Sequence, residues 1–185
     1  ETCFSNTVPF GEYCNQHGIQ FGQQLHMTND AWRFTPVRDV LPNGEDPRDP
    51  EVTRWLLEQG YLVLHEGKTF WQYTDQWEDR PSYLVSMSKL IDKPHWIDVA
   101  RFYRFTYRAI ASATNERTVI FALLPHGVAT GHSAPIENAV AARPLGAAMV
   151  TIALANSFVF DWANRIRVGS NVTQYILNSS PVPAI

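Results

Sequence analysis

The stretch that most restricts the fold is 145–160, which is apolar apart from Thr151, Asn156 and Ser157. It is shorter than the roughly 20 residues that a helix needs to cross a bilayer, so it does not predict a membrane span. Pro144 suits the first turn of a helix. Five residues recur at helical spacing: Leu145, Met149, Ile152, Asn156 and Val159. We therefore expect one long buried helix near the C-terminus, with the amide of Asn156 on its apolar face.

A chain of 185 residues with 45% hydrophobic and 18% charged residues is typical of one folded domain, here 1–185. At this length about 70% of the unfolded surface is buried, which is enough for a core without disulfides. The least ordered segment is 35–50, where four prolines, Asn43-Gly44 and several acids predict a solvated Pro-rich acidic loop.

Other segments predict a mixture of helices and strands. A short helix is expected at 51–59, ended by Gly60. Strands are expected at 61–65, 82–86, 102–109, 118–124 and 175–177, with 69–73 as a possible second arm of a hairpin. The predicted fold is α+β, with a mixed β-sheet flanked by helices.

Charge divides the chain into two unlike halves. Residues 1–100 contain 8 Lys or Arg and 15 Asp or Glu, whereas residues 101–185 contain 7 Arg, no Lys and only 3 acids. A basic half built from Arg suits contacts with phosphate and guanine, because the guanidinium donates bidentately. An accident of composition accounts equally well for the asymmetry.

The two cysteines, Cys3 and Cys14, have no second Cys or His pair at ligand distance, so they predict no zinc site. The chain opens on Glu1, without Met and without a basic and apolar leader. We expect a piece of a longer, reduced, cytoplasmic protein.

Arg104 and Arg108 are the first candidates for a site. In a strand they share one face with Phe102 and Thr106, and in a helix they share a face with Arg101. Two arginines beside exposed aromatics could form a platform for phosphates and bases. The commoner explanation is a solvated face whose Arg stems cover apolar neighbours.

Several blocks, in this order, together resemble a known family. They are 24–30 (QLHMTND) with Phe34, 61–68 (YLVLHEGK) with 71–73 (WQY), 103–111 (YRFTYRAIA), 114–120 (TNERTVI) with 124–125 (LP), 156–161 (NSFVFD) and 180–183 (SPVP). The set is similar to the C-terminal target-recognition region of large bacterial N6-adenine DNA methyltransferases, the fused modification or restriction–modification enzymes. The 114–118 and 156–158 blocks are the most specific.

The resemblance implies a division of labour. The family's catalytic domain carries an Asn/Asp-Pro-Pro-Tyr/Phe motif and a Gly-containing loop for S-adenosylmethionine, and this sequence has neither. The parent would therefore methylate adenine N6 with S-adenosylmethionine, while this segment, without catalysis or cofactor, would bind double-stranded DNA beside the catalytic domain of the same polypeptide. The sequence also departs from the family at Thr69, which replaces Met, and at 73–75, which replaces Phe-Asp.

Polar residues of the matching blocks and of the Arg-rich half are the candidates for DNA contacts. They are Lys68, Gln72, Arg104, Arg108, Asn115, Arg117, Arg165 and Arg167. Structural roles are open for several: Glu66 and Lys68 can pair across a turn, Asn115 and Glu116 can brace the next strand, and Asn156 is better explained as a hydrogen-bonded core amide.

One alternative belongs to a different class of function. Asp49, Glu66 and Lys68 imitate the Asp…Glu-x-Lys set of magnesium-dependent nucleases, in which two carboxylates hold the metal and Lys orients water. Asp49 lies in the Pro-rich loop, and Gly67 would weaken a strand that presents Glu66 and Lys68. No nucleophile-elbow pattern surrounds His126 or His132.

Overall fold

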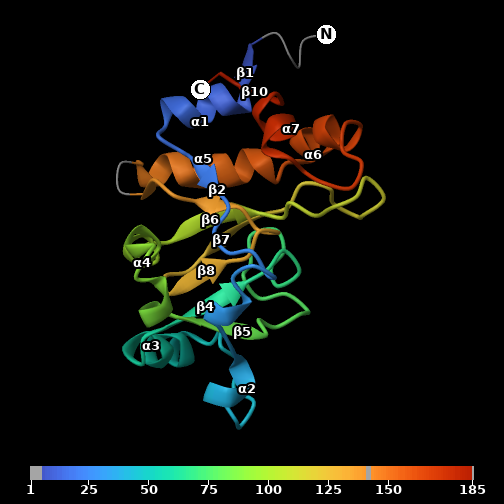
Figure 1. Ribbon diagram of the computed structural model, residues 1–185. Coiled ribbons are helices and arrows are strands. Elements are labelled where there is room, and N and C mark those ends of the chain that lie inside the picture. Colours follow the sequence, from blue (N-terminus) through green and yellow to red (C-terminus); the bar gives the residue numbers. More distant parts are fainter. Residues whose placement is uncertain (1–5, 141–142, 185) are drawn as a thin grey trace.

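The structure is a computed structural model that describes residues 6–140 and 143–184. The α+β fold expected from the sequence is confirmed, with three small sheets, one of them mixed. Figure 1 shows helices at both ends of the molecule and the two larger sheets between them.

The mixed sheet has the strand order β3-β5-β4-β8. Its strands are β3 (Phe34–Pro36), β5 (Tyr83–Ser86), β4 (Tyr61–His65) and β8 (Val128–Thr130). β4 runs antiparallel to β5 and parallel to β8. It follows α3 (Pro50–Glu58), whose first turn is capped by the Asp49 carboxylate and which is ended by Gly60 at a φ of 80°. The helix and both strands predicted here are confirmed.

The second sheet is antiparallel, in the order β2-β9-β6-β7. Its strands are β2 (Phe21–Gly22), β9 (Ile136–Glu137), β6 (Arg104–Tyr107) and β7 (Phe121–Leu124). β6 and β7 lie within the two segments predicted as strands at 102–109 and 118–124. Short helices at Ala31–Arg33, Met87–Leu90 and α4 (Pro94–Val99) lie in the connections between the two sheets, and α2 (Val37–Val40) lies between β3 and α3.

Alternate residues of the strands serve different cores. In β4, Val63 belongs to a core that also contains Ala122 and Leu124 of β7, so this core lies between the two sheets. Leu62 and Leu64 belong to another core on the opposite face of β4. Successive side chains of β4 therefore point to opposite faces of the sheet and pack into different cores.

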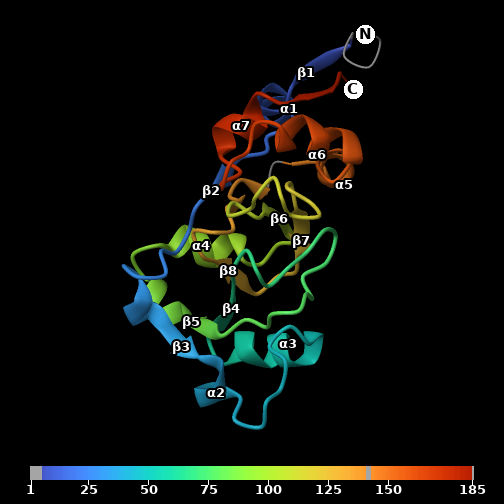
Figure 2. The same cartoon turned by 90° about the vertical axis from the view of Figure 1, so that its right-hand side faces the viewer.

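The third core packs helices on the outer face of the antiparallel sheet. It joins Phe105 and Phe121 to Phe10, Ile152 and Phe160. The helices are α1 (Phe10–Gln16), α5 (Leu145–Ala155), α6 (Phe158–Arg165) and α7 (Gln174–Asn178). β1 (Thr7–Pro9) pairs with β10 (Pro181–Pro183), which brings both ends of the described chain together (Figure 2).

The single long helix predicted at 145–160 is wrong, because α5 ends before Asn156 and α6 begins after Ser157 at an angle of 58°. The Ser157 hydroxyl caps α6 by accepting from the Phe160 N–H at 3.2 Å. The predicted stripe is right only in part: Ile152 and Asn156 are buried, whereas Leu145 is 73% exposed. Small residues, Ala148 and Ala155, face the core instead and let α5 approach β7.

Among the described residues, no single helix is long and apolar enough to cross a membrane. α5 and α6 satisfy that test of length and composition only as a bent pair.

Three further predictions need correction. The 35–50 segment is not one solvated loop, because it contains the end of β3, all of α2 and the buried Arg48, which donates to Asp46 at 2.8 Å. Residues 69–73 form no hairpin arm; β4 pairs with β5 and β8 instead. Residues 175–177 are helical, because the Thr173 hydroxyl caps α7 by accepting from the Ile176 N–H.

Candidate nucleic-acid interface

Two of the predicted cations, Lys68 and Arg108, meet at a small hollow of about 250 Å³. Lys68 comes from the turn after β4, and Arg108 directly follows β6, so the two sheets bring them together. We call this site the cationic hollow; it is lined by Glu66, Gly67, Lys68, Arg108, Ile110 and Ser133.

The turn that carries Lys68 is fixed by local hydrogen bonds. The Thr69 hydroxyl accepts from the Glu66 N–H at 3.2 Å and donates to the Glu66 carbonyl at 2.9 Å. The Gly67 N–H donates to the Ser133 hydroxyl at 3.1 Å. A Cβ at Gly67 would lie 2.9 Å from the Ser133 carbonyl oxygen, so only glycine permits this close approach.

Lys68 presents its charge to solvent. Its side chain is 54% exposed, and its Nζ lies 3.9 Å from a carboxylate oxygen of Glu66. The pairing across the turn is therefore present, but it is long and exposed, and such pairs contribute little to stability. An anion can compete for this ammonium group.

Arg108 is held more firmly. Its Nη2 donates to the Phe70 carbonyl at 2.7 Å, and its guanidinium lies 4.9 Å from the centroid of the Trp71 ring. Its Nε is buried and has no hydrogen-bond partner in the described part of the chain. Burial lowers the pKa of Arg108, and the charge of Asp79 opposes this shift. The guanidinium stays a cation, and it lines the hollow.

Arg104 does not share this surface, and the predicted Arg104–Arg108 platform is wrong. Arg104 is fully buried and points between the two sheets, where its Nη2 donates to the Val128 carbonyl at 2.6 Å. Burial lowers its pKa to about 10, which the charge of Glu137 opposes. β6 lies between β7 and β9 with both faces covered, so no DNA phosphate reaches Arg104.

Arg117 and Arg165 lie together around the buried Asp161 of α6. Asp161 accepts from the N–H groups of Thr118 and Val119 at 2.8 and 2.7 Å. Arg165 donates to Asp161 at 3.2 Å and to the Ala113 carbonyl at 3.1 Å. The cluster therefore braces 112–119 against α6.

Three further DNA-contact candidates, Arg117, Gln72 and Arg167, also have side-chain partners within the protein, whereas Asn115 is bonded through its backbone. Arg117 is buried and donates to the Asn156 carbonyl at 2.6 Å. The Gln72 amide lies 3.3 Å from the Asn156 side chain. Asn115 is half-buried on the braced segment, where its N–H donates to the Ser112 carbonyl. Arg167 is exposed but donates to the Ser180 hydroxyl at 3.2 Å.

The two carboxylates of the nuclease-like set lie on different elements, Asp49 at the start of α3 and Glu66 in the turn after β4. The Asp49 carboxylate caps α3 and accepts from the Glu51 N–H at 2.9 Å. Across residues 6–140 and 143–184 no group of three or more His, Cys, Asp or Glu could hold a metal ion. Cys14 is buried as a free thiol.

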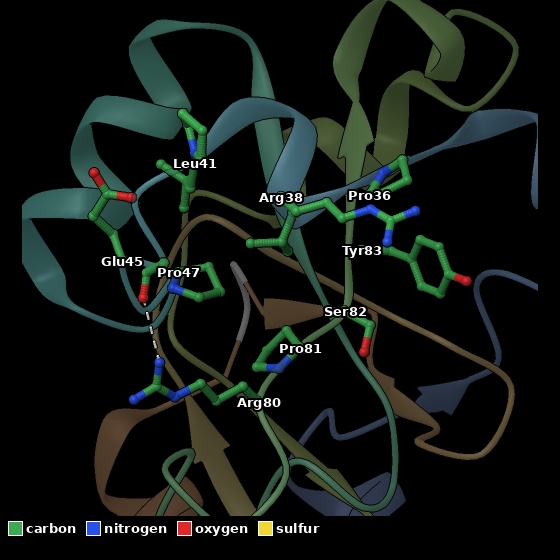
Figure 3. Close-up of a pocket in the computed structure, with 12 residues that line it drawn as sticks. Pro36, Arg38, Leu41, Glu45, Pro47, Arg80, Pro81, Ser82 and Tyr83 are labelled. Carbon is green, nitrogen blue, oxygen red and sulfur yellow. Dashed lines mark hydrogen bonds between the residues drawn. The ribbon is translucent and has the colours of Figure 1, made fainter.

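A larger hollow of about 480 Å³ lies elsewhere, beside α2 and the start of β5. Figure 3 shows Pro36, Pro47 and Pro81 around it, together with Arg38 and Arg80. Two carboxylates offset these arginines: Asp46 lies 3.2 Å from Arg80, and Glu45 also lines the hollow. This local neutralisation makes it a weaker candidate for an anion.

No protein-family model matches the chain, and no curated protein is detectably similar to it.

Proposed function

We propose that this chain is the DNA-binding target-recognition part of a site-specific adenine-N6 DNA methyltransferase or restriction–modification enzyme. The observation that carries the proposal is the cationic hollow, where Lys68 and Arg108 converge from distant parts of the sequence. The resemblance described above supports the same function, and its blocks at 61–68 and 103–111 contain both residues.

The hollow suits a phosphate of double-stranded DNA. Lys68 supplies an exposed point charge, and Arg108 supplies guanidinium donors held in place by Phe70 and Trp71. Glu66 leaves the site with a net charge near +1, so the attraction is local and modest. Contacts of this type position a protein on the duplex and make its affinity depend on salt.

The rest of the proposed enzyme lies outside this sequence. The motifs for S-adenosylmethionine and for the target adenine are absent, so we assign no step of methyl transfer to this chain. The proposed partner is the catalytic methyltransferase domain of the same polypeptide, which would supply the cofactor, and the proposed location is the cytoplasm.

Titration of fluorescent double-stranded DNA with the purified chain, read as anisotropy at low and at physiological salt, tests this function. We expect saturable binding that weakens as salt rises, and no methyl transfer from labelled S-adenosylmethionine to the same DNA. Absence of binding at low salt would refute the proposal. Turnover above background would show that the chain is more than a recognition part.

A further inference from the structure

A second pocket, of about 480 Å³, adjoins the cationic hollow between the antiparallel sheet and the segment that leads into α7. None of the described residues that line it is charged. Its polar side chains include Gln23, His132, Asn171 and Gln174, and its apolar wall includes Ile110. We call it the amide pocket.

The two sites share a wall. Ile110 lines both of them, and His132 of the amide pocket is followed by Ser133 of the cationic hollow. The Ala109 N–H donates to the Ser133 carbonyl at 2.9 Å, which fixes the two segments side by side. One ligand can therefore reach both sites if it has an anionic part and a neutral part.

The exposed side-chain amides of the amide pocket can hydrogen-bond such a neutral part, although the Asn171 amide also donates to the Ser170 hydroxyl at 3.4 Å. Gln23, Asn171 and Gln174 are exposed, and each amide both donates and accepts. His132 stacks on His26 at 4.8 Å between ring centroids, but its Nδ1 is buried without a hydrogen-bond partner among the described residues.

We propose that the amide pocket receives one unstacked nucleobase while the adjoining phosphate lies in the cationic hollow. The inference rests on the proposed function and adds that this part binds DNA in which one base is unstacked. Side-chain amides match the donor and acceptor pattern of base edges, and the absence of charge disfavours a second phosphate. The volume lies within the range of pockets that enclose small organic ligands.

An unstacked base has a consequence for DNA preference. Extruding a base from an intact duplex costs a few kcal/mol, and the cost is smallest where the base is already unpaired. The chain should therefore bind a duplex with one bulged nucleotide more tightly than the fully paired duplex. The same bulge without its base should lose this advantage.

The test compares anisotropy titrations of three DNAs: a paired duplex, the duplex with one bulged nucleotide, and the duplex with an abasic bulge at that position. We expect the bulged base to improve Kd about tenfold over the abasic bulge. The double variant Asn171→Ala/Gln174→Ala should remove this difference and keep the affinity for paired DNA. Asn43→Ala, an exposed amide elsewhere, should leave the difference intact.

Any of three other results would overturn the inference. Equal binding of the bulged base and the abasic bulge by the unaltered chain, with paired DNA still bound, would refute the amide pocket alone. A preference that persists in the double variant would place the base elsewhere. Failure to bind any of the three DNAs would refute the pocket together with the proposed function.

Discussion

Replacing Asn156 by Ala removes a side chain that covers the open edge of a sheet. β7 is the last strand of its sheet, and its Phe121 N–H donates to the Asn156 side-chain oxygen at 2.9 Å. The Asn156 amide N–H donates in turn to the Phe121 carbonyl at 2.8 Å. Asn156 is only 5% exposed, so the alanine variant leaves the Phe121 N–H buried without this partner. The Tyr73 N–H still serves the Phe121 carbonyl.

The expected cost can be divided into two parts. An unsatisfied buried N–H costs about 1–3 kcal/mol, and the other lost hydrogen bond contributes about 1 kcal/mol, so the free energy of unfolding should fall by about 2–4 kcal/mol. For a chain of this size a loss of about 3 kcal/mol lowers Tm by roughly 6–12 °C.

Urea unfolding followed by tryptophan fluorescence measures the change in unfolding free energy. Asn43→Ala is the matched control, because that exposed amide donates to the exposed Glu45 and its loss should cost no more than about 0.5 kcal/mol of unfolding free energy. If Asn156→Ala were as stable as this control, the side chain would not be the structural partner of the β7 edge.

Two other predictions concern buried titratable groups. Burial lowers the pKa of His65 to about 3, with Arg48 acting in the same direction. As the pH falls, the unfolded chain binds this proton before the folded chain does, so the free energy of unfolding should fall by about 2 kcal/mol between pH 7.5 and 5. Urea titrations at several pH values should show that His65→Gln lacks this fall. The same pH profile in the variant and the unaltered chain would contradict the prediction. Burial raises the pKa of the Cys14 thiol to about 12, so in a Cys3→Ser background Cys14 should react with a thiol reagent only after unfolding; rapid reaction of the native chain would contradict it.

Local sequence patterns located the elements whose signals are self-contained. Asp49 and Gly60 mark the two ends of α3, and the apolar run after Gly60 becomes β4. The break after α5 had a local signal too, because Ser157 is a good helix cap. The strong apolar character of 145–160 outweighed that signal in the prediction.

The site was harder to predict because the roles of the arginines depend on long-range packing. Alternation along β6 places Arg104 and Arg108 on one face, but β6 ends at Tyr107, so only Arg104 remains between the stacked sheets. Six of the 7 arginines in 101–185 donate to groups of the protein itself: Arg104, Arg108, Arg117, Arg143, Arg165 and Arg167. A count of basic residues cannot distinguish these internal donors from a surface for DNA.

The salt dependence of DNA binding by Lys68→Ala tests the central claim most directly. If Lys68 neutralises a phosphate, its loss should weaken binding to every duplex alike and reduce the slope of log K against log salt by about 0.9. Arg38→Ala is the control, since it removes a still more exposed cation, 88% against 54% for Lys68, from the separate hollow beside α2. An unchanged affinity and slope in folded Lys68→Ala, or an equal change in Arg38→Ala, would contradict the assignment of the cationic hollow to DNA.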